Sequence, residues 1–216
     1  MDVDLKNEAT KRGFFIEDKD FLAFSYTNKK SVADKIESNS FPLIFTSQHG
    51  VKGFNFLRKK FNFKIKKNHC YAIEGTTSRT AIAAGFEVIN TALNAAQLAE
   101  RIIENQESNV LHCTTKHRRH ELASKLTEAG VNINVCEVYD KKMLPQKVAD
   151  FDGVLFFSPS QFDAFTACNH LMVDTPIFCI GATTAKHAKN LNHKNIIVAE
   201  QANEAAVLTT VYEYFK

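Results

Sequence analysis

Short apolar runs bounded by turn residues alternate with amphipathic stretches along the chain. The runs are apolar throughout rather than alternating, which is typical of parallel strands that are covered on both faces. The amphipathic stretches have helical spacing, as at Leu122, Leu126 and Ala129, where Gly130 then signals a helix end. This order predicts an α/β fold with a mostly parallel sheet. The predicted strands are 42–45, 71–74, 109–112, 133–138, 153–157, 177–180 and 196–199.

One strand-to-helix pattern occurs twice in the chain. In each copy an apolar strand ends in hydroxyl residues, a second strand leads into a glycine followed by threonines, and a later helix opens with an asparagine cap. Because the three matches keep the same order, the sequence predicts two similar α/β domains with a cleft between them. The matched segments are 43–48 with 155–160, 72–78 with 179–185, and 94–98 with 203–207.

Hydroxyl residues stand where predicted strands hand over to helices in both copies. Ligands bind at the carboxyl ends of parallel strands, and the unpaired N–H groups of a helix N-terminus favour carboxylate or phosphate. The pattern therefore predicts a large ligand with several anionic groups. The alternative is that these side chains only cap their helices. The residues concerned are Thr77, Ser78, Thr183 and Thr184.

Composition agrees with a folded chain and narrows the function classes. The 216 residues, 44% hydrophobic and 24% charged, exclude a disordered chain, a collagen and a coiled coil. Eighteen Phe and no Trp indicate a core built on phenylalanine, and a net charge of +3 is too small to indicate a nucleic-acid partner. Five cysteines without zinc spacing predict free thiols in a reducing compartment. Without a signal peptide or membrane span, we expect a cytoplasmic protein.

Other motifs leave alternatives open. The glycines fit neither a dinucleotide fingerprint nor a P-loop, and no metal-ligand spacing or nucleophile elbow occurs. Segment 112–120 is rich in His, Lys and Arg, and is either an anion-binding loop or a solvated basic turn. Segment 52–67 interleaves basic residues with Phe; its spacing favours a helix and a short strand with buried rings over a single-stranded nucleic-acid site. Tyr139 follows a predicted strand and fits either the edge of the core or an acid in the cleft.

Taken together, these segments resemble the uroporphyrinogen-III synthase family of haem and tetrapyrrole biosynthesis. The resemblance covers roughly residues 10 to 216 and implies two flavodoxin-like parallel-sheet domains, joined by a two-stranded connector, with the active site in the cleft. Residues 1–25 and 142–216 would form the outer domain, and 28–139 the inserted domain. The first strand of the family has no counterpart, because the chain starts almost directly in a helical stretch, 4–12. The segments that carry the resemblance are 44–47, 138–139, 156–160 and 180–185, with the Arg119–Leu122–Leu126–Gly130 pattern and the helix near Asn94.

The resemblance implies a cofactor-independent lyase that acts as a monomer on hydroxymethylbilane, a small-molecule polycarboxylate, without metal, nucleic acid or membrane. The terminal hydroxyl leaves as water, and closure through a spiro intermediate inverts the terminal pyrrole ring to give uroporphyrinogen III. Carried over by position, Tyr139 would donate a hydrogen bond to the departing hydroxyl. The carboxylates of the substrate would bind at Ser47, Ser78, Ser158, Ser160, Thr183 and Thr184, with Arg119 as a further contact.

Two other functions are compatible with the sequence. A non-catalytic tetrapyrrole- or anion-binding module would keep the fold without the activity, and the missing first strand is what suggests it. A two-domain binding protein of the periplasmic type is the other, and the lack of a signal peptide argues against it.

Overall fold

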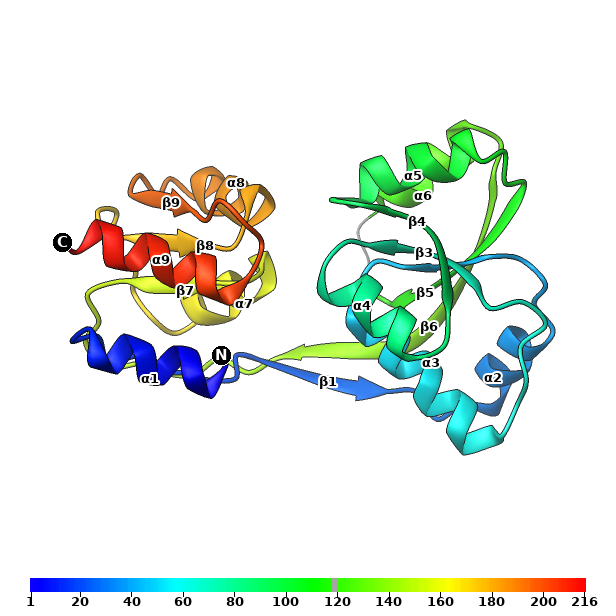
Figure 1. Ribbon diagram of the computed structural model, residues 1–216, viewed down its shortest axis with the longest axis horizontal. Coiled ribbons are helices and arrows are strands. Elements are labelled where there is room, and N and C mark those ends of the chain that lie inside the picture. The colour runs from blue at the N-terminus through cyan, green and yellow to red at the C-terminus, as the bar shows by residue number, and fades with distance from the viewer. Residues whose placement is uncertain (118–119) are drawn as a thin grey trace. The chain divides into compact units, whose positions relative to one another are not determined.

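The computed structural model describes residues 1–117 and 120–216. Its contacts divide the chain into two compact units. Unit 1 consists of Met1–Ala23 and Lys142–Lys216, and unit 2 of Phe24–Lys141. The chain passes from one unit to the other twice, within strand β1 (Leu22–Tyr26) and within strand β6 (Asn132–Met143). The fold is mixed α/β, with one six-stranded and one three-stranded sheet (Figure 1).

The six-stranded sheet is doubly wound. Its order is β1-β6-β5-β2-β3-β4, and β2 to β6 are parallel neighbours. Counted along the chain, the parallel strands have the order 3-2-1-4-5, whereas flavodoxin has 2-1-3-4-5. The flavodoxin-like expectation therefore holds in unit 2 only as far as a doubly wound parallel sheet. The remaining strands are β2 (Leu43–Phe45), β3 (His69–Ile73), β4 (Glu87–Ala92) and β5 (Asn109–Thr115).

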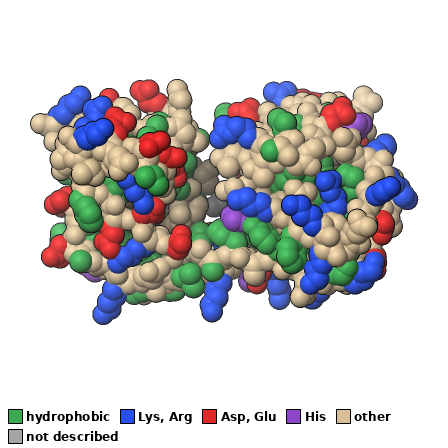
Figure 2. Space-filling model, turned by 60° about the horizontal axis from the view of Figure 1, so that its bottom comes forward, with side chains coloured by type: hydrophobic (Ala, Val, Ile, Leu, Met, Phe, Trp, Pro, Cys, Tyr) green, Lys and Arg blue, Asp and Glu red, His purple; other side chains and the backbone are tan. Residues whose placement is uncertain are grey.

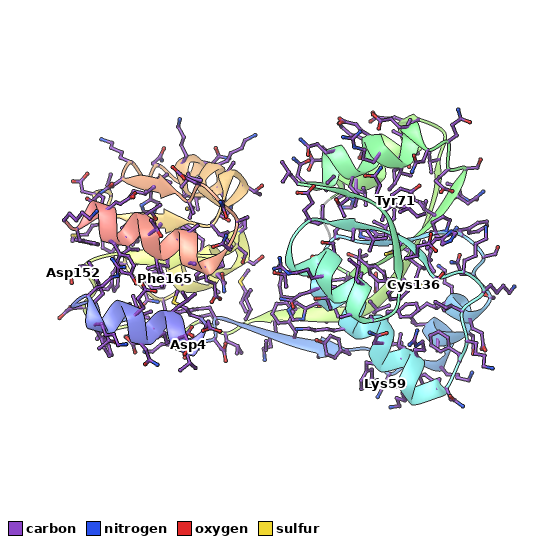
Figure 3. All side chains as sticks on the ribbon, viewed as in Figure 1. Asp4, Lys59, Tyr71, Cys136, Asp152 and Phe165 are labelled. Carbon is purple, nitrogen blue, oxygen red and sulfur yellow. The ribbon has the colours of Figure 1, made fainter. Side chains whose placement is uncertain are left out.

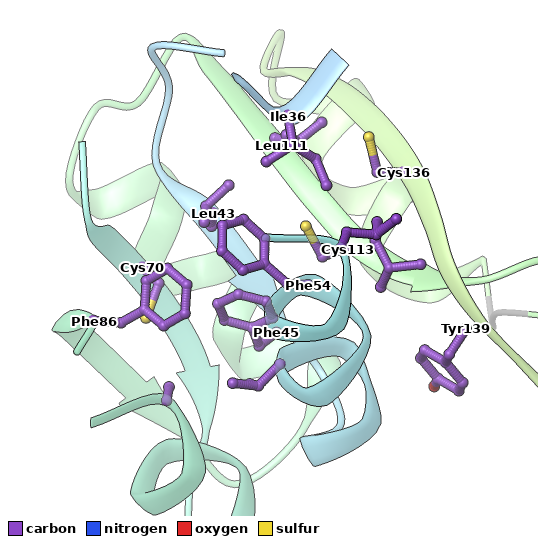
Figure 4. Packing of buried hydrophobic residues seen from close by; sticks show 14 of the residues in the cluster. Ile36, Leu43, Phe45, Phe54, Cys70, Phe86, Leu111, Cys113, Cys136 and Tyr139 are labelled. Atoms are coloured by element: carbon purple, nitrogen blue, oxygen red, sulfur yellow. The ribbon is translucent and has the colours of Figure 1, made fainter. Parts of the chain in front are cut away.

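Helices cover both faces of this sheet, which explains the continuous apolar runs. Ile44 packs in the cluster that includes α5 and α6, and its neighbour Phe45 packs in the cluster that includes α2, α3 and α4. Figure 4 shows Phe45 and Phe54 within the second cluster. A strand with helices on each side must be apolar at successive positions. The helices are α2 (Lys30–Glu37), α3 (Gln48–Phe61), α4 (Thr76–Ala83), α5 (Ala95–Glu104) and α6 (Glu121–Glu128).

The sheet of unit 1 has three parallel strands in the order β7-β8-β9. Phe162 and Phe165 of α7 pack on one face of it, and Val207 and Val211 of α9 belong to the other cluster, around Phe178. The predicted helix at 4–12 is confirmed as α1, which packs against α9. The elements are α1 (Val3–Lys11), β7 (Val154–Phe156), α7 (Pro159–Thr166), β8 (Ile177–Cys179), α8 (Ala182–Asn190), β9 (Ile196–Val198) and α9 (Glu204–Tyr214).

The basic, Phe-rich segment 52–67 differs in part from its prediction. Its first part is the helix α3, as expected, but the short strand is wrong, because the described residues 62–68 contain none. Asn62 ends the helix in the left-handed region, at φ 50°. Phe54 and Phe63 are buried, whereas Phe56 is 39% exposed and lies beneath the Lys60 ammonium. On the face drawn in Figure 2, Lys and Arg side chains are scattered together with Asp and Glu.

All five cysteines are free thiols, as predicted. Burial raises the pKa of Cys70 to about 12 and that of Cys136 and Cys179 to about 11. Cys136 lies inside unit 2 (Figure 3). These three buried thiols are therefore protonated at neutral pH and serve as small apolar side chains. Across residues 1–117 and 120–216, no helix is both long and apolar enough to cross a membrane.

Candidate active site

The two serines of the repeated pattern are both helix caps. Ser47 has extended backbone angles, and its Oγ accepts a hydrogen bond from the backbone N–H of His49 at 3.2 Å. Ser158 begins α7 in the same way, and its Oγ accepts from the N–H of Gln161 at 3.2 Å. Each hydroxyl thus satisfies one of the unpaired N–H groups of its helix. The Ser158 hydroxyl also donates to Oε1 of Gln161 at 3.5 Å, whereas the Ser47 hydroxyl can donate its proton to another partner.

The glycine turns begin α4 and α8 without a side-chain cap. Gly75 precedes α4 at φ 82°, a conformation that favours glycine, whereas Gly181 precedes α8 in extended backbone. None of the described side chains caps either helix, so their first N–H groups are free of side-chain acceptors. Such a helix N-terminus can bind a carboxylate through backbone N–H groups.

The hydroxyl residues of these turns are not equivalent. The Ser78 hydroxyl donates to the carbonyl oxygen of Gly75 at 3.1 Å. Thr77 and Thr184 are buried in the packing of their helices, and Thr183 is exposed. Thr183 therefore offers the more accessible hydroxyl of the pair in α8.

Polar side chains gather in unit 2 where the strand order reverses, between β2 and β5. Thr46 follows β2, and its Oγ1 lies 3.1 Å from Nε2 of the buried His112 on β5. Thr115 ends β5 and is paired in register with Tyr139 of β6. Tyr139 therefore lies near the carboxyl edge of the sheet, on the strand next to β5, and β5 borders the switch point where doubly wound folds bind ligands.

The Tyr139 phenol is enclosed but has a polar partner. Its side chain is buried, with the Phe24 and His49 rings at centroid distances of 6.3 and 5.8 Å. Burial raises the pKa of Tyr139, and a hydrogen bond with the Ser47 side chain partly opposes that rise. Figure 4 shows the ring apart from the tightly packed Phe45, Phe54 and Phe86. The phenol is thus protonated at neutral pH and can donate a hydrogen bond.

Two glycines hold α3 close to the strands that carry this site. A Cβ on Gly53 would lie 2.5 Å from the carbonyl oxygen of Val138, and one on Gly50 would lie 2.5 Å from that of Cys113. The helix therefore lies directly on the backbone of β5 and β6. This close approach brings the helix that begins after Ser47 onto the strand in which Tyr139 follows Val138.

His49 is a site residue that the sequence did not reveal. Its imidazole stacks on Phe24 at a centroid distance of 3.5 Å, and its Nδ1 lies 3.2 Å from the Tyr26 hydroxyl. Burial, with the nearby Lys52 cation, lowers the pKa of His49 to about 4, so the ring is neutral at pH 7. No motif marks this position, because a histidine early in a helix has many other uses. The β1 residues around it also lie outside the predicted strands.

The other predicted residues occupy different places. Ser47, Ser78 and Tyr139 belong to unit 2. Arg119 lies outside the described residues, and the part of segment 112–120 up to Thr115 is strand rather than loop. The unit 1 residues are Ser158, Ser160, Thr183 and Thr184.

Unit 1 also contains a cavity of about 440 Å³ beside β7, whose lining includes both phenylalanines, such as Phe14 and Phe165, and carboxylates, such as Asp18 and Asp150. None of the predicted site residues lines it. Within the described part of the chain, no group of three or more His, Cys, Asp or Glu side chains is arranged to hold a metal ion.

Comparison with known proteins gives one family. The model of uroporphyrinogen-III synthase HemD matches residues 23–209. No curated protein matches the chain significantly.

Solved structures with the same fold come from two bacteria. A uroporphyrinogen-III synthetase from Helicobacter pylori is 20% identical, with a TM-score of 0.63 over 90% of this chain and 91% of that one. A mutant uroporphyrinogen III synthase from Thermus thermophilus is 14% identical, with a TM-score of 0.72 over 99% of this chain and 94% of that one. The wild-type Thermus protein in a second crystal form is 13% identical, with a TM-score of 0.55 over 98% and 93%. At these identities the structures show a shared fold.

Proposed function

The chain belongs to the uroporphyrinogen-III synthase family, and we propose that its Tyr139 assists departure of the terminal hydroxyl of the substrate. The family consists of cofactor-independent cyclising lyases of haem biosynthesis, and this is the activity of the chain. The observation that carries the role of Tyr139 is its position. A protonated phenol lies near the carboxyl edge of the unit 2 sheet, one strand from the switch point, and the Ser47 side chain lowers its pKa.

In the first step, the terminal hydroxyl of hydroxymethylbilane leaves with the electron pair of its C–O bond. Tyr139 donates a hydrogen bond to that oxygen and stabilises the charge that develops on it. Electron release from the adjoining pyrrole nitrogen gives an azafulvenium cation. Loss of its N–H proton, which combines with the departing hydroxide as water, gives a neutral azafulvene. The substituted carbon of the far ring then attacks this azafulvene to form the spiro intermediate. Fragmentation and reclosure then invert the ring. The low polarity around the phenol keeps its proton in place at neutral pH.

We propose that the substrate carboxylates bind to the helix starts of both units. The N–H groups of α4 and α8 have no side-chain caps among the described residues, which supports this role, and Thr183 adds an exposed hydroxyl. Ser47 and Ser158 cap α3 and α7, and Ser160 lies in the first turn of α7. Thr184 and Ser78 shape their turns through packing and a backbone hydrogen bond. We also propose Arg119 as a contact for a substrate carboxylate, as the family resemblance implies.

We also propose that the two units act as the two domains of the family, 1–25 with 142–216 and 28–139, with β1 and β6 as the connector. Two hydrogen bonds support the connector: the Thr27 N–H donates to Val138 at 3.1 Å, and the Leu144 N–H donates to Phe21 at 2.9 Å. The residue numbers run in opposite directions, as in an antiparallel pair. We further propose that the protein is a cytoplasmic monomer that acts on hydroxymethylbilane and has no nucleic-acid or membrane partner.

An isomer-resolved product assay tests this function. The protein is incubated with freshly prepared hydroxymethylbilane, and the two uroporphyrinogen isomers are separated after oxidation to the porphyrins. We expect the inverted isomer III to predominate with the wild-type protein. Isomer I alone, at the rate of the enzyme-free control, would identify a non-catalytic binding module instead.

Tyr139→Phe tests the role of the phenol in the same assay. General acid assistance contributes about 10²- to 10⁴-fold, so we expect kcat to fall by about 10²-fold or more while KM stays similar. A folded Tyr139→Phe variant with wild-type kcat would show that Tyr139 belongs only to the edge of the core.

A further inference from the structure

The rings around Tyr139 form a connected group that the reaction scheme does not use. Phe24 and Tyr26 come from β1, His49 from α3 and Tyr139 from β6. We propose that His49 is a positioning residue, which braces the first turn of α3 so that Ser47 holds the Tyr139 phenol in place for proton donation. This inference rests on the proposed role of Tyr139.

The His49 side chain is held by neighbours on two strands. Its ring is nearly parallel to that of Phe24, at an interplanar angle of 6° and a centroid distance of 3.5 Å. The Tyr26 hydroxyl is within hydrogen-bond distance of Nδ1, at 3.2 Å. The third neighbour is the tilted ring of Tyr139, at 5.8 Å. Stacking, a hydrogen bond and a tilted ring contact together leave the imidazole little freedom to rotate.

The backbone of the same residue leads to the phenol. The N–H of His49 donates to Ser47 Oγ, and the Ser47 side chain lies close enough to Tyr139 to lower the pKa of its phenol. Since Ser47 Oγ already accepts that N–H, its own proton can point to the phenol oxygen. The phenol proton then remains free for the departing hydroxyl. Contacts that hold the His49 side chain in place therefore also restrain Ser47, whose Oγ accepts the His49 N–H and whose side chain faces the phenol.

The brace requires an uncharged imidazole. A neutral ring can accept the Tyr26 hydrogen bond at Nδ1, whereas an imidazolium has no acceptor. The groups that face His49 are the Tyr26 phenol on β1, the Tyr139 phenol on β6 and the Lys52 ammonium on its own helix. Burial and this cation both favour the neutral form. A neutral His49 also has no charge with which to shift the pKa of Tyr139, so Ser47 is the side chain that lowers this pKa.

Kinetics of His49→Ala, His49→Phe and Tyr26→Phe in the isomer assay test the inference. A displacement of about 1 Å at a catalytic group can cost about 10²-fold. For His49→Ala we expect kcat to fall by about 10- to 100-fold with KM within about twofold. His49→Phe keeps a ring on Phe24 and should lose less, by about the same factor as Tyr26→Phe. His69→Ala is the matched control, because His69 lies at the opposite, amino end of β3, 41% exposed, and should keep wild-type kinetics.

The decisive measurement is the same substitution in a Tyr139→Phe background. If His49 acts through the phenol, His49→Ala should change kcat there by less than about twofold, because coupled residues are not additive. Full additivity, or unchanged kcat in the single His49→Ala variant, would overturn the inference.

A second readout does not depend on activity. Ultraviolet difference titration against Tyr139→Phe follows the Tyr139 phenol alone, and in His49→Ala its pKa should move towards the ordinary tyrosine value as water reaches it. An unmoved pKa would also overturn the positioning role. A wild-type protein that forms only isomer I, but shows the titration shift, would refute the proposed function and leave the brace as a structural fact.

Discussion

Gly53→Ala is the sharpest test of how α3 positions the site. The new Cβ would lie 2.5 Å from the Val138 carbonyl oxygen and 3.0 Å from its carbon, both backbone atoms that cannot rotate away. To reach an ordinary contact of about 3.4 Å, the helix must retreat from β6 by about 0.9 Å. Because Ser47 moves with the helix and Tyr139 stays with β6, we expect the retreat to weaken the interaction by which Ser47 lowers the pKa of Tyr139.

The magnitudes separate the effect on stability from the effect on catalysis. Overpacking costs about 1–3 kcal/mol, and the better helix propensity of alanine offsets up to about 1 kcal/mol of it. We therefore expect a modest net loss, of about 0–2 kcal/mol, which leaves the protein folded. The effect on catalysis should be larger: a misplacement of nearly 1 Å should lower kcat by about 10- to 100-fold.

Urea unfolding and the isomer assay on the same preparation measure both quantities. Lys59→Ala is the control, because it introduces an alanine on the exposed side of α3 (Figure 3). This variant should change neither the urea midpoint nor kcat. If Gly53→Ala has wild-type kcat and is folded, the close approach of α3 to β6 does not determine the geometry of the site, and the coupling between helix position and catalysis is refuted.

Three further predictions concern the caps, the core and pH. Ser47→Ala and Ser158→Ala should each lose about 1 kcal/mol of cap energy, but only Ser47→Ala should lower kcat, because only Ser47 bonds to Tyr139; equal kcat values in steady-state assays would contradict this. Phe54→Ala should destabilise unit 2 by about 3–5 kcal/mol in urea unfolding, since Phe54 is fully buried between Phe45, Phe63 and Phe86. The pKa of His49 is lowered to about 4 in the folded state, against 6.5 for an ordinary histidine, so the unfolded chain takes up this proton first and stability falls as the pH drops from about 6.5 towards 4. Urea midpoints across that range should fall less for His49→Phe than for the wild type, and parallel curves would contradict the shift.

The sequence was a good guide to the central strands and a poor one to the edges. The predicted run at 42–45 corresponds to β2, and that at 177–180 to β8, because strands covered on both faces must be apolar at every position. β4 (Glu87–Ala92) lies at the edge of its sheet and includes Glu87, Asn90 and Thr91, so it contains no such run. β1 lies at the other edge and is only half-buried, and the same criterion misses it.

Strand ends were also underestimated where polar residues are buried. The predicted strand 109–112 continues to Thr115, because Thr114 and Thr115 remain buried within the sheet. β6 continues to Met143, five residues beyond the apolar run. These extensions carry Tyr139 and Thr115, its partner in the strand register. The part of the sheet that carries the proposed site is therefore the part that the hydrophobic pattern describes least well.

The duplicated turns show why residue type alone does not assign a role. Ser47 and Ser158 follow equivalent strands, cap equivalent helices and accept N–H groups at the same distance. They differ in what lies beside them. α3 contacts the backbone of β6 through Gly53, and β6 supplies Tyr139 next to Val138. The proposed roles of the two serines therefore differ: Ser47 lies beside the proposed proton donor in unit 2, and Ser158 caps a proposed anion-binding turn in unit 1. That difference depends on the approach of a helix to a strand distant in the sequence, and repeat patterns do not encode it.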